Sequence, residues 1–339
     1  MKYDELLASL ESATSIRKAN PTTNDAHVNV PLNNIVVAYM QSATMVADKI
    51  FPVVPVSKQS DLFYKYDIDT FYRDDARLRA PSSESAGGGF KFSTDTYGCL
   101  IEAYHKDIDD QLRANADSVL QLDRAAAEFV AQKMVLRRET RFLSTFFKTG
   151  VWGRDWTGIP SGTPSSTQFT QFDAATAADP RIPFEAAKLK MLETTGYEPN
   201  VALFGAQVMS KLLTNSFIRD QFKYTSAESI NETMIANYLG LDAVYVSKSV
   251  VATGAEGASA TIGLQAGKDV LLAYRAPAPS VLAPSAGYTF SWTGMGGMGI
   301  QTTRMRAPLI ASDRIEAQMS YDYKVVAPLL GVYLSGAVA

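Results

Sequence analysis

The chain has 339 residues, of which 46% are hydrophobic and 20% are charged, and its formal net charge at pH 7 is −3. This apolar content is enough for one large core or two smaller ones, which excludes an intrinsically disordered chain. The near-neutral charge argues against a protein whose main task is to grip nucleic acid, because such proteins carry a basic excess. The single cysteine, Cys99, excludes an intrachain disulfide and fits a reducing site of folding such as a bacterial cytoplasm.

The N-terminal region predicts an extended arm. Acidic residues such as Asp4 and Glu5, and the lack of a long apolar run, exclude a secretory signal. Residues 20–34 are polar and turn-rich, and the helix pattern that follows must end by Ile50 because Pro52 lies just beyond it. No stretch reaches ~18 uninterrupted apolar residues, so no membrane span is expected.

Residues 56–110 predict a projecting β-hairpin. Tyr64 and Tyr66 alternate with charged residues in the first strand, and Phe90 and Phe92 open the second. A charged, glycine-rich stretch separates the two strands. Residues 51–110 contain eleven Asp/Glu and seven Lys/Arg, a difference of −4, so the hairpin is expected to be acidic.

The clearest predicted helix covers residues 117–148, where apolar residues recur at helical spacing without Gly or Pro. Residues 111–150 contain seven Lys/Arg against four Asp/Glu, a difference of +3. The basic face, with Arg137, Arg138 and Arg141, has three open interpretations. It could pair with the acidic hairpin of a neighbouring subunit, contact the phosphates of DNA, or simply be solvated.

The C-terminal half predicts mixed helices and strands, after a Ser/Thr/Gly/Pro-rich loop or small insertion at 149–183. The apolar tail from Val325 predicts a buried strand. The predicted helices are 184–194, 206–213 and 229–239, and the predicted strands are 200–204, 243–251, 269–274, 288–292, 299–306 and 314–326. The fold class is therefore α+β.

The sequence predicts no catalytic residue, no metal ligand set and no cofactor site. His105 lies among aspartates, but the spacing matches no metal motif, and Asp runs before a helix serve turns and caps. Cys99 has no CxxC partner and is expected to be buried on the same strand face as Tyr97 and Ile101. The glycine cluster at 294–299 precedes a strand and lacks a following Lys-Ser/Thr, so it is not a phosphate loop.

Residues 35–155 resemble tailed-bacteriophage major capsid proteins. The resemblance is carried by VAYMQSATMVADKIFPVVPVSKQSDLFYKYD, FYRDDARLRAPSSESAGGGFKFSTDTYGC, AYHKDIDDQLRANAD, LDRAAAEFVAQKMVLRRETRF and FFKTGVW, in that order. It implies the Hong Kong 97-type capsid fold. The implied parts are an N-terminal arm (1–50), an extended β-hairpin loop (51–107), a peripheral domain with a long spine helix and an insertion loop (108–180), an axial domain (181–310) and C-terminal strands that return to the peripheral domain (311–339).

The resemblance also implies a structural protein that is not an enzyme. Such subunits form pentamers and hexamers that tile an icosahedral head around double-stranded DNA, after assembly in the host bacterial cytoplasm. The implied partners are copies of the chain itself, scaffolding, portal and decoration proteins, and packaged DNA contacted without sequence specificity.

Functional residues are therefore expected at interfaces between subunits. The candidates are Tyr64, Tyr66, Phe71, Arg73, Asp74, Asp75, Arg77, Arg79, Arg137, Arg138 and Arg141. Three alternatives stay open: an encapsulin-like nanocompartment shell with the same fold, an enzyme of unknown class, and a minor virion protein such as a decoration or tail component.

Overall fold

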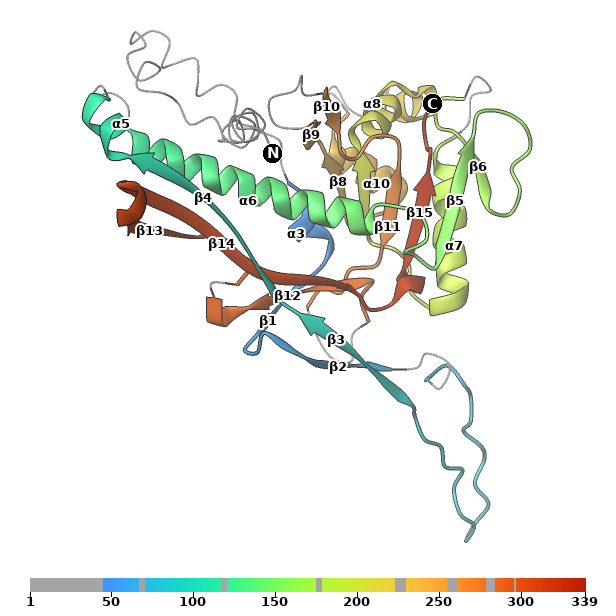
Figure 1. Ribbon diagram of the computed structural model, residues 1–339. Coiled ribbons are helices and arrows are strands. Elements are labelled where there is room, and N and C mark those ends of the chain that lie inside the picture. Colours follow the sequence, from blue (N-terminus) through green and yellow to red (C-terminus); the bar gives the residue numbers. More distant parts are fainter. Residues whose placement is uncertain are drawn as a thin grey trace, which may run out of the picture.

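The computed structural model describes residues 45–66, 71–116, 121–174, 179–222, 230–254, 261–278, 284–295 and 297–339. Most of the predicted arm, residues 1–44, lies outside these ranges. The described chain forms two sheets that are joined by one long helix, and a β-hairpin projects from the body (Figure 1). The α+β class is confirmed.

The first sheet has five strands and is built around β14, which spans Ser312–Val325. Residues 312–321 of β14 pair antiparallel with β4, and residues 312–318 also pair with β13. Since these partners lie up to about two hundred residues away along the chain, β14 fastens distant segments together. The other strands are β1 (Val53–Val56), β4 (Leu100–Asp109), β12 (Gly287–Trp292) and β13 (Gln301–Ala307).

Helix α6 (Leu122–Phe146) packs along β4 and β14, as Figure 1 shows. Its buried side includes Ala126, Val130 and Met134, which are four residues apart and therefore share one face. At 1.5 Å per residue, 25 residues give a rod of about 37 Å. The predicted long helix is confirmed over 122–146, whereas residues 117–120 lie outside the described ranges.

The second sheet has six strands in the order β6-β5-β15-β11-β7-β8. Its central strands β7 and β11 are buried throughout, as expected for strands covered on both faces. The strands are β5 (Arg154–Ile159), β6 (Gln168–Thr170), β7 (Val201–Gly205), β8 (Ala243–Ser247), β11 (Val270–Ala273) and β15 (Gly331–Ser335). The helices after β6 are α7 (Arg181–Thr195), α8 (Ala206–Thr214), α9 (Ser216–Phe222) and α10 (Glu232–Leu239).

One sequence prediction about this region needs correction, and a second one is confirmed. The loop predicted at 149–183 contains the strands β5 and β6. Apolar and polar residues alternate only weakly in them, and these strands are instead stabilised by the parallel pairing of β5 with β6 and with the distant β15. The C-terminal tail does form a buried strand, but β15 pairs with β11 and β5 in the six-stranded sheet, while β14 stays in the other sheet. The domain boundaries themselves stay a prediction.

Two further sheets have two strands each. β2 (Ser60–Tyr66) pairs with β3 (Phe92–Gly98), and β9 (Val250–Thr253) pairs with β10 (Thr261–Leu264). The single strand predicted at 243–251 is thus divided into β8 and β9. The reason is Ser249, which is buried between them and hydrogen-bonded to Gln265. The short elements are α3 (Ala47–Ile50), α5 (Asp110–Asn115), η3 (Thr293–Met295), η4 (Pro308–Ile310) and η5 (Pro328–Leu330).

A buried carboxylate joins three of these parts. Glu139 of α6 accepts hydrogen bonds at one oxygen, Oε2, from the backbone N–H groups of Val46 and Ala47, both at 2.9 Å. Its other oxygen, Oε1, accepts a hydrogen bond from the Ser247 hydroxyl of β8 at 3.2 Å. Burial raises the pKa of Glu139, and the two backbone donors oppose that change. The carboxylate therefore connects the start of the described chain, α6 and the six-stranded sheet.

We predict that Glu139→Ala destabilises the subunit strongly, because three buried donors lose their acceptor at about 1–3 kcal/mol each. Glu139→Gln keeps an acceptor and should cost less. The folded state raises the pKa of Glu139 above the unfolded value near 4.5. Protonation of Glu139 therefore stabilises the folded state fully below about pH 4.5. This contribution to stability is lost as the pH rises through the higher pKa of the folded state. Urea unfolding across pH should show this slope in the parent and not in Glu139→Gln.

Candidate inter-subunit surfaces

The projecting hairpin has an aromatic root. Phe290 of β12 stacks on Tyr97 at 4.5 Å between ring centroids and contacts Phe63 at 5.3 Å. Cys99 is fully buried beside them. Ile101, which was expected on the same face as Cys99, is instead 44% exposed. The alternation fails because Cys99 lies between β3 and β4 and belongs to neither strand.

Polar contacts fix the same root to the body. The Gly98 N–H donates to Asp322 of β14 at 3.1 Å, and Asp322 also accepts from the Arg141 guanidinium of α6 at 3.2 Å. Arg141 lies over the Tyr321 ring, 5.1 Å from its centroid. The direction in which the hairpin leaves the body is therefore set by α6 and β14.

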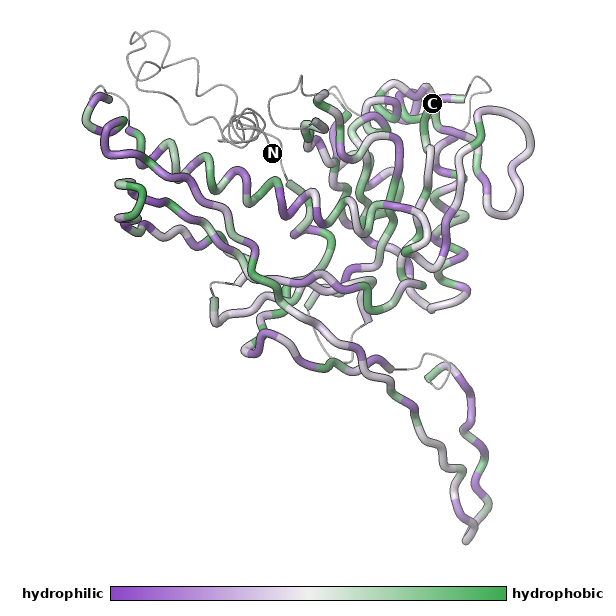
Figure 2. Tube along the Cα trace, viewed as in Figure 1, coloured by the Kyte–Doolittle hydropathy of each residue, from purple (hydrophilic) through white to green (hydrophobic). Residues whose placement is uncertain are grey.

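Beyond the root, residues 71–91 are almost entirely exposed (Figure 2 shows apolar and polar positions mixed along this segment). Tyr64, Phe71, Phe90 and Phe92 are each more than half exposed, and Leu78 is completely exposed. Tyr64 contacts Phe92 and Phe71 contacts Phe90, with ring centroids 5.5 and 6.0 Å apart. Exposed aromatic side chains in this number are typical of a partner-binding surface.

The acidic excess expected for residues 51–110 does not lie in the tip of the hairpin. Residues 71–91 contain four Lys/Arg and three Asp/Glu, a difference of +1. The acidic excess of residues 51–110 arises largely in β4 and at the start of α5, inside the five-stranded sheet region. The candidates Arg73, Asp74, Asp75, Arg77 and Arg79 are all exposed on the tip. The tip is therefore mixed in charge, and the side chain of Tyr66 lies outside the described residues.

The basic candidates on α6 are largely engaged within the subunit. Arg138 is mostly buried and lies 3.5 Å from Asp48, and Arg141 pairs with Asp322. Arg137 is more exposed and pairs with Glu102 at 3.2 Å. Contact of these arginines with another subunit or with DNA stays a prediction, for which Arg137 is the most accessible of the three.

Tyr72 is one of the loop's aromatic residues, but its contact within the subunit was not predicted from the sequence. Its hydroxyl donates to the backbone carbonyl of Thr195 at the C-terminus of α7, which links the loop to the six-stranded sheet region. The next residue, Gly196, has φ +68°, and a Cβ placed there would lie 3.3 Å from the Tyr72 hydroxyl. Burial raises the pKa of Tyr72, so the phenol stays protonated and able to donate at neutral pH.

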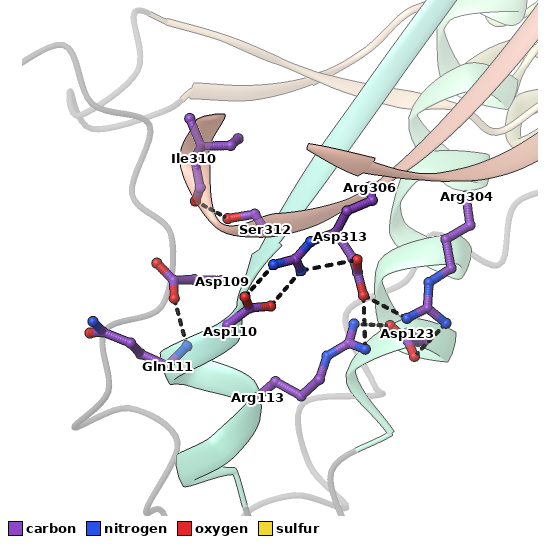
Figure 3. Close-up of polar contacts among 10 residues, drawn as sticks. All are labelled: Asp109, Asp110, Gln111, Arg113, Asp123, Arg304, Arg306, Ile310, Ser312 and Asp313. Carbon is purple, nitrogen blue, oxygen red and sulfur yellow. Dashed lines mark hydrogen bonds and ion pairs between the residues drawn. The ribbon is translucent and has the colours of Figure 1, made fainter. Parts of the chain in front are cut away.

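A charged network at the end of the body was also missed (Figure 3). Arg306 binds Asp110 with both guanidinium nitrogens, at 2.6 and 2.5 Å, and Asp313 at 3.2 Å. Arg304 binds Asp313 at 2.6 Å, and Arg113 bridges Asp313 and Asp123. Hydrogen bonds from Arg304 and Arg306 hold the pKa of Asp313 below its usual range. Asp109 caps α5 by accepting from Gln111 N–H, which confirms the capping role expected for this Asp run.

This network holds an exposed apolar apex between β13 and β14. Leu309 is completely exposed, and Ile310 and Met305 are nearly half exposed. Ala311 closes the turn at φ +46°. In the sequence, this site is marked only by Arg304 and Arg306, followed by Pro308. That pattern does not indicate which aspartates the fold places beside the two arginines.

The described residues contain no group of three or more His, Cys, Asp or Glu side chains that could hold a metal ion. His105 lies in β4 with its Nε2 3.9 Å from Asp107, which is paired with Arg314 instead. Within the described part of the chain, no helix has the length and apolar character needed to cross a membrane.

Three solved structures share this fold. A phage-related protein from Bordetella bronchiseptica is 22% identical with a TM-score of 0.64, over 91% of this chain and 97% of its own. The capsid structure of cyanophage P-SCSP1u gives 12% identity and a TM-score of 0.57, over 94% and 98%. An encapsulin complex from Synechococcus elongatus gives 10% and 0.50, over 97% and 95%. No family model and no curated protein matches the chain.

The chain therefore has the tailed-phage capsid fold that the sequence resemblance implied. The same fold occurs in the encapsulin, so the fold alone does not decide the function of this chain.

We predict that Tyr72→Phe increases hydrogen–deuterium exchange in residues 71–91 without changing the melting temperature, because it removes only the bond that ties the loop to α7. Tyr64→Phe, in the paired part of the hairpin, is the matched control. Equal exchange in the parent and Tyr72→Phe would show that this hydrogen bond does not hold the loop.

Proposed function

We propose that the chain is the major capsid protein of a tailed bacteriophage, which assembles into pentamers and hexamers of an icosahedral head. The observation that carries this proposal is the exposed loop of residues 71–91 on a capsid-type fold. A two-stranded hairpin is marginally stable alone, so the loop is expected to gain its order from a neighbouring subunit.

The loop has features that could both stabilise a contact with a neighbouring subunit and fix its alignment. Its exposed aromatic rings supply apolar area, and the alternating charges from Arg73 to Arg79 favour one alignment over others. The turn between β13 and β14, which carries Leu309, gives a second exposed apolar point, and Figure 1 shows this turn far from the tip of the hairpin. Contacts at widely separated points suit a subunit that tiles a surface better than one that encloses a substrate.

In this proposal residues 1–50 form the arm, 51–107 the extended loop and 108–180 the peripheral domain with the spine helix. Residues 181–310 form the axial domain around the capsomer axis, and 311–339 contribute the closing strands. Scaffolding, portal and decoration proteins are the expected partners, and packaged double-stranded DNA is contacted without sequence specificity. The protein acts in the virion after assembly in the host cytoplasm, and no catalytic step is assigned to it.

An encapsulin-like compartment is the second candidate, because an encapsulin shares the fold over 97% of this chain. The contents of the particle separate the two functions. We predict that particles from infected cells contain nuclease-protected double-stranded DNA, measured after nuclease treatment and extraction. Particles that instead enclose a folded cargo protein and no DNA would favour the encapsulin.

We predict that replacing residues 67–91 with a two-residue Asn-Gly turn prevents shell assembly while the subunit stays folded. Tyr66 and Phe92 are the last paired residues of β2 and β3, so a tight turn can close the shortened hairpin and keep its aromatic root. Electron microscopy and sedimentation should show soluble subunits or capsomers and no shells.

The control for this excision keeps the loop length and replaces residues 82–89 with a Gly/Ser segment, which leaves Tyr72 and the exposed aromatic residues in place. That variant should assemble. Normal shells from the excised variant would remove the role assigned to the loop.

A further inference from the structure

A second projecting ribbon lies at the edge of the six-stranded sheet. In it β9 and β10 pair antiparallel, with Ile262 opposite Ala252 and Leu264 opposite Val250. Since alternate residues share a face, these four side chains form one apolar face. Ile262 is 68% exposed and Leu264 41%. An isolated two-stranded ribbon of this size is marginally stable in water, so we expect its apolar face to be covered by another surface.

The base of this ribbon is held firmly. The Gln265 side-chain amide donates to Thr140 of α6 at 2.6 Å, and its carbonyl oxygen accepts from Ser249 at 3.1 Å. Ser249 in turn contacts Ser247, which binds the buried Glu139. The ribbon is therefore presented in a fixed position on the side of the sheet where α6 lies.

Helix α7 has a second apolar side. Its inner side packs into the core through Phe184 and Met191. Its outer side carries Ile182 and Leu189, 68% and 58% exposed, with Leu192 beside them. Residues 182 and 189 are two turns apart and share a face. A helix that is apolar on both sides is typical of a buried position, which α7 does not have in the isolated subunit.

The ribbon base and α7 lie on opposite faces of the six-stranded sheet. Ser247 of β8 points toward Glu139 of α6. Its neighbour Val246 is in register with Phe204 of β7, so both side chains point to the other face, where Phe204 contacts Phe184 of α7 at 5.8 Å. Figure 1 likewise draws β9 and β10 beside β8 and α7 beyond β5. The two apolar surfaces therefore cannot cover each other within one subunit.

We propose that the apolar face of β9–β10 docks on the outer side of α7 of the next copy of this chain, and that repetition of this contact closes the capsomer ring. This inference rests on the proposed function. A second copy is the occupant because each chain supplies both surfaces in equal number and on opposite faces, which is what a head-to-tail ring requires. The charges beside the α7 surface are neutralised locally by the pairs Arg181–Glu185 and Lys190–Glu193, so no net charge opposes an apolar contact.

Thiol crosslinking tests the contact. The variants are Ile262→Cys, Leu189→Cys and the double variant, each purified as assembled capsomers or particles and treated with a short bismaleimide. The native Cys99 is buried and its pKa is raised to about 11, so it stays unreactive at neutral pH, and the parent protein is the control. The double variant should give a covalent ladder ending at five or six subunits. A mixture of the two single variants should stop at dimers.

The outcomes are distinct. Crosslinked dimers from Ile262→Cys alone would indicate a symmetric ribbon-to-ribbon contact and overturn the proposal. Particles of the double variant that yield no ladder would overturn it too, while the proposed function would stand. If the parent forms neither capsomers nor particles under any condition, the proposed function fails and this contact fails with it.

Charge variants provide an independent measurement. Leu189→Glu should lower the yield of capsomers at least about tenfold, because an unpaired carboxylate would be buried in the contact. Leu189→Met, which keeps an apolar side chain at the same position and leaves the Lys190–Glu193 pair intact, should assemble nearly as the parent does. Ile262→Glu and Thr261→Glu form the corresponding pair on β10. Equal yields within each pair would contradict the contact, and circular dichroism verifies that each subunit is folded.

Discussion

The carboxylate of Glu139 is the constraint on which the arrangement of the subunit depends. It is buried, and it accepts hydrogen bonds from the beginning of the described chain and from β8. Loss of this carboxylate would leave three buried hydrogen-bond donors without an acceptor. Each unsatisfied donor would destabilise the folded subunit. The three segments are therefore fixed relative to one another. Because α6 also packs along β4 and β14, it fixes the position of the five-stranded sheet relative to them.

From this fixed centre the subunit extends three exposed features. The hairpin leaves through a root held by Phe290 and Asp322, the apex at Leu309 is supported by the Arg/Asp network, and the β9–β10 ribbon is anchored through Gln265. Each feature is held at its base by ring contacts, hydrogen bonds or ion pairs and carries exposed apolar side chains beyond it. This combination suits assembly, because only the parts beyond each base have to gain order when subunits meet.

The sequence allowed the long helix, most strands and the projecting hairpin to be predicted, because each has a local signature. Periodic apolar residues mark α6, and alternating Tyr64 and Tyr66 mark β2. The interface candidates stay predictions, because contacts with another subunit have no local signature. Leu309 carries no local signal that separates it from other exposed residues. The acidic residues counted over 51–110 include Asp107, Asp109 and Asp110, which the structure places in β4 and α5.

By itself, the sequence determined the α+β class, the absence of an intrachain disulfide and the family resemblance of residues 35–155. These follow from composition and short-range pattern. Only the tertiary structure decided that β15 leaves β14 for the other sheet, that Arg138 and Arg141 pair within their own subunit, and that the base of the β9–β10 ribbon and α7 lie on opposite faces of the six-stranded sheet. These depend on contacts between residues far apart in the chain, whose partners no local pattern identifies.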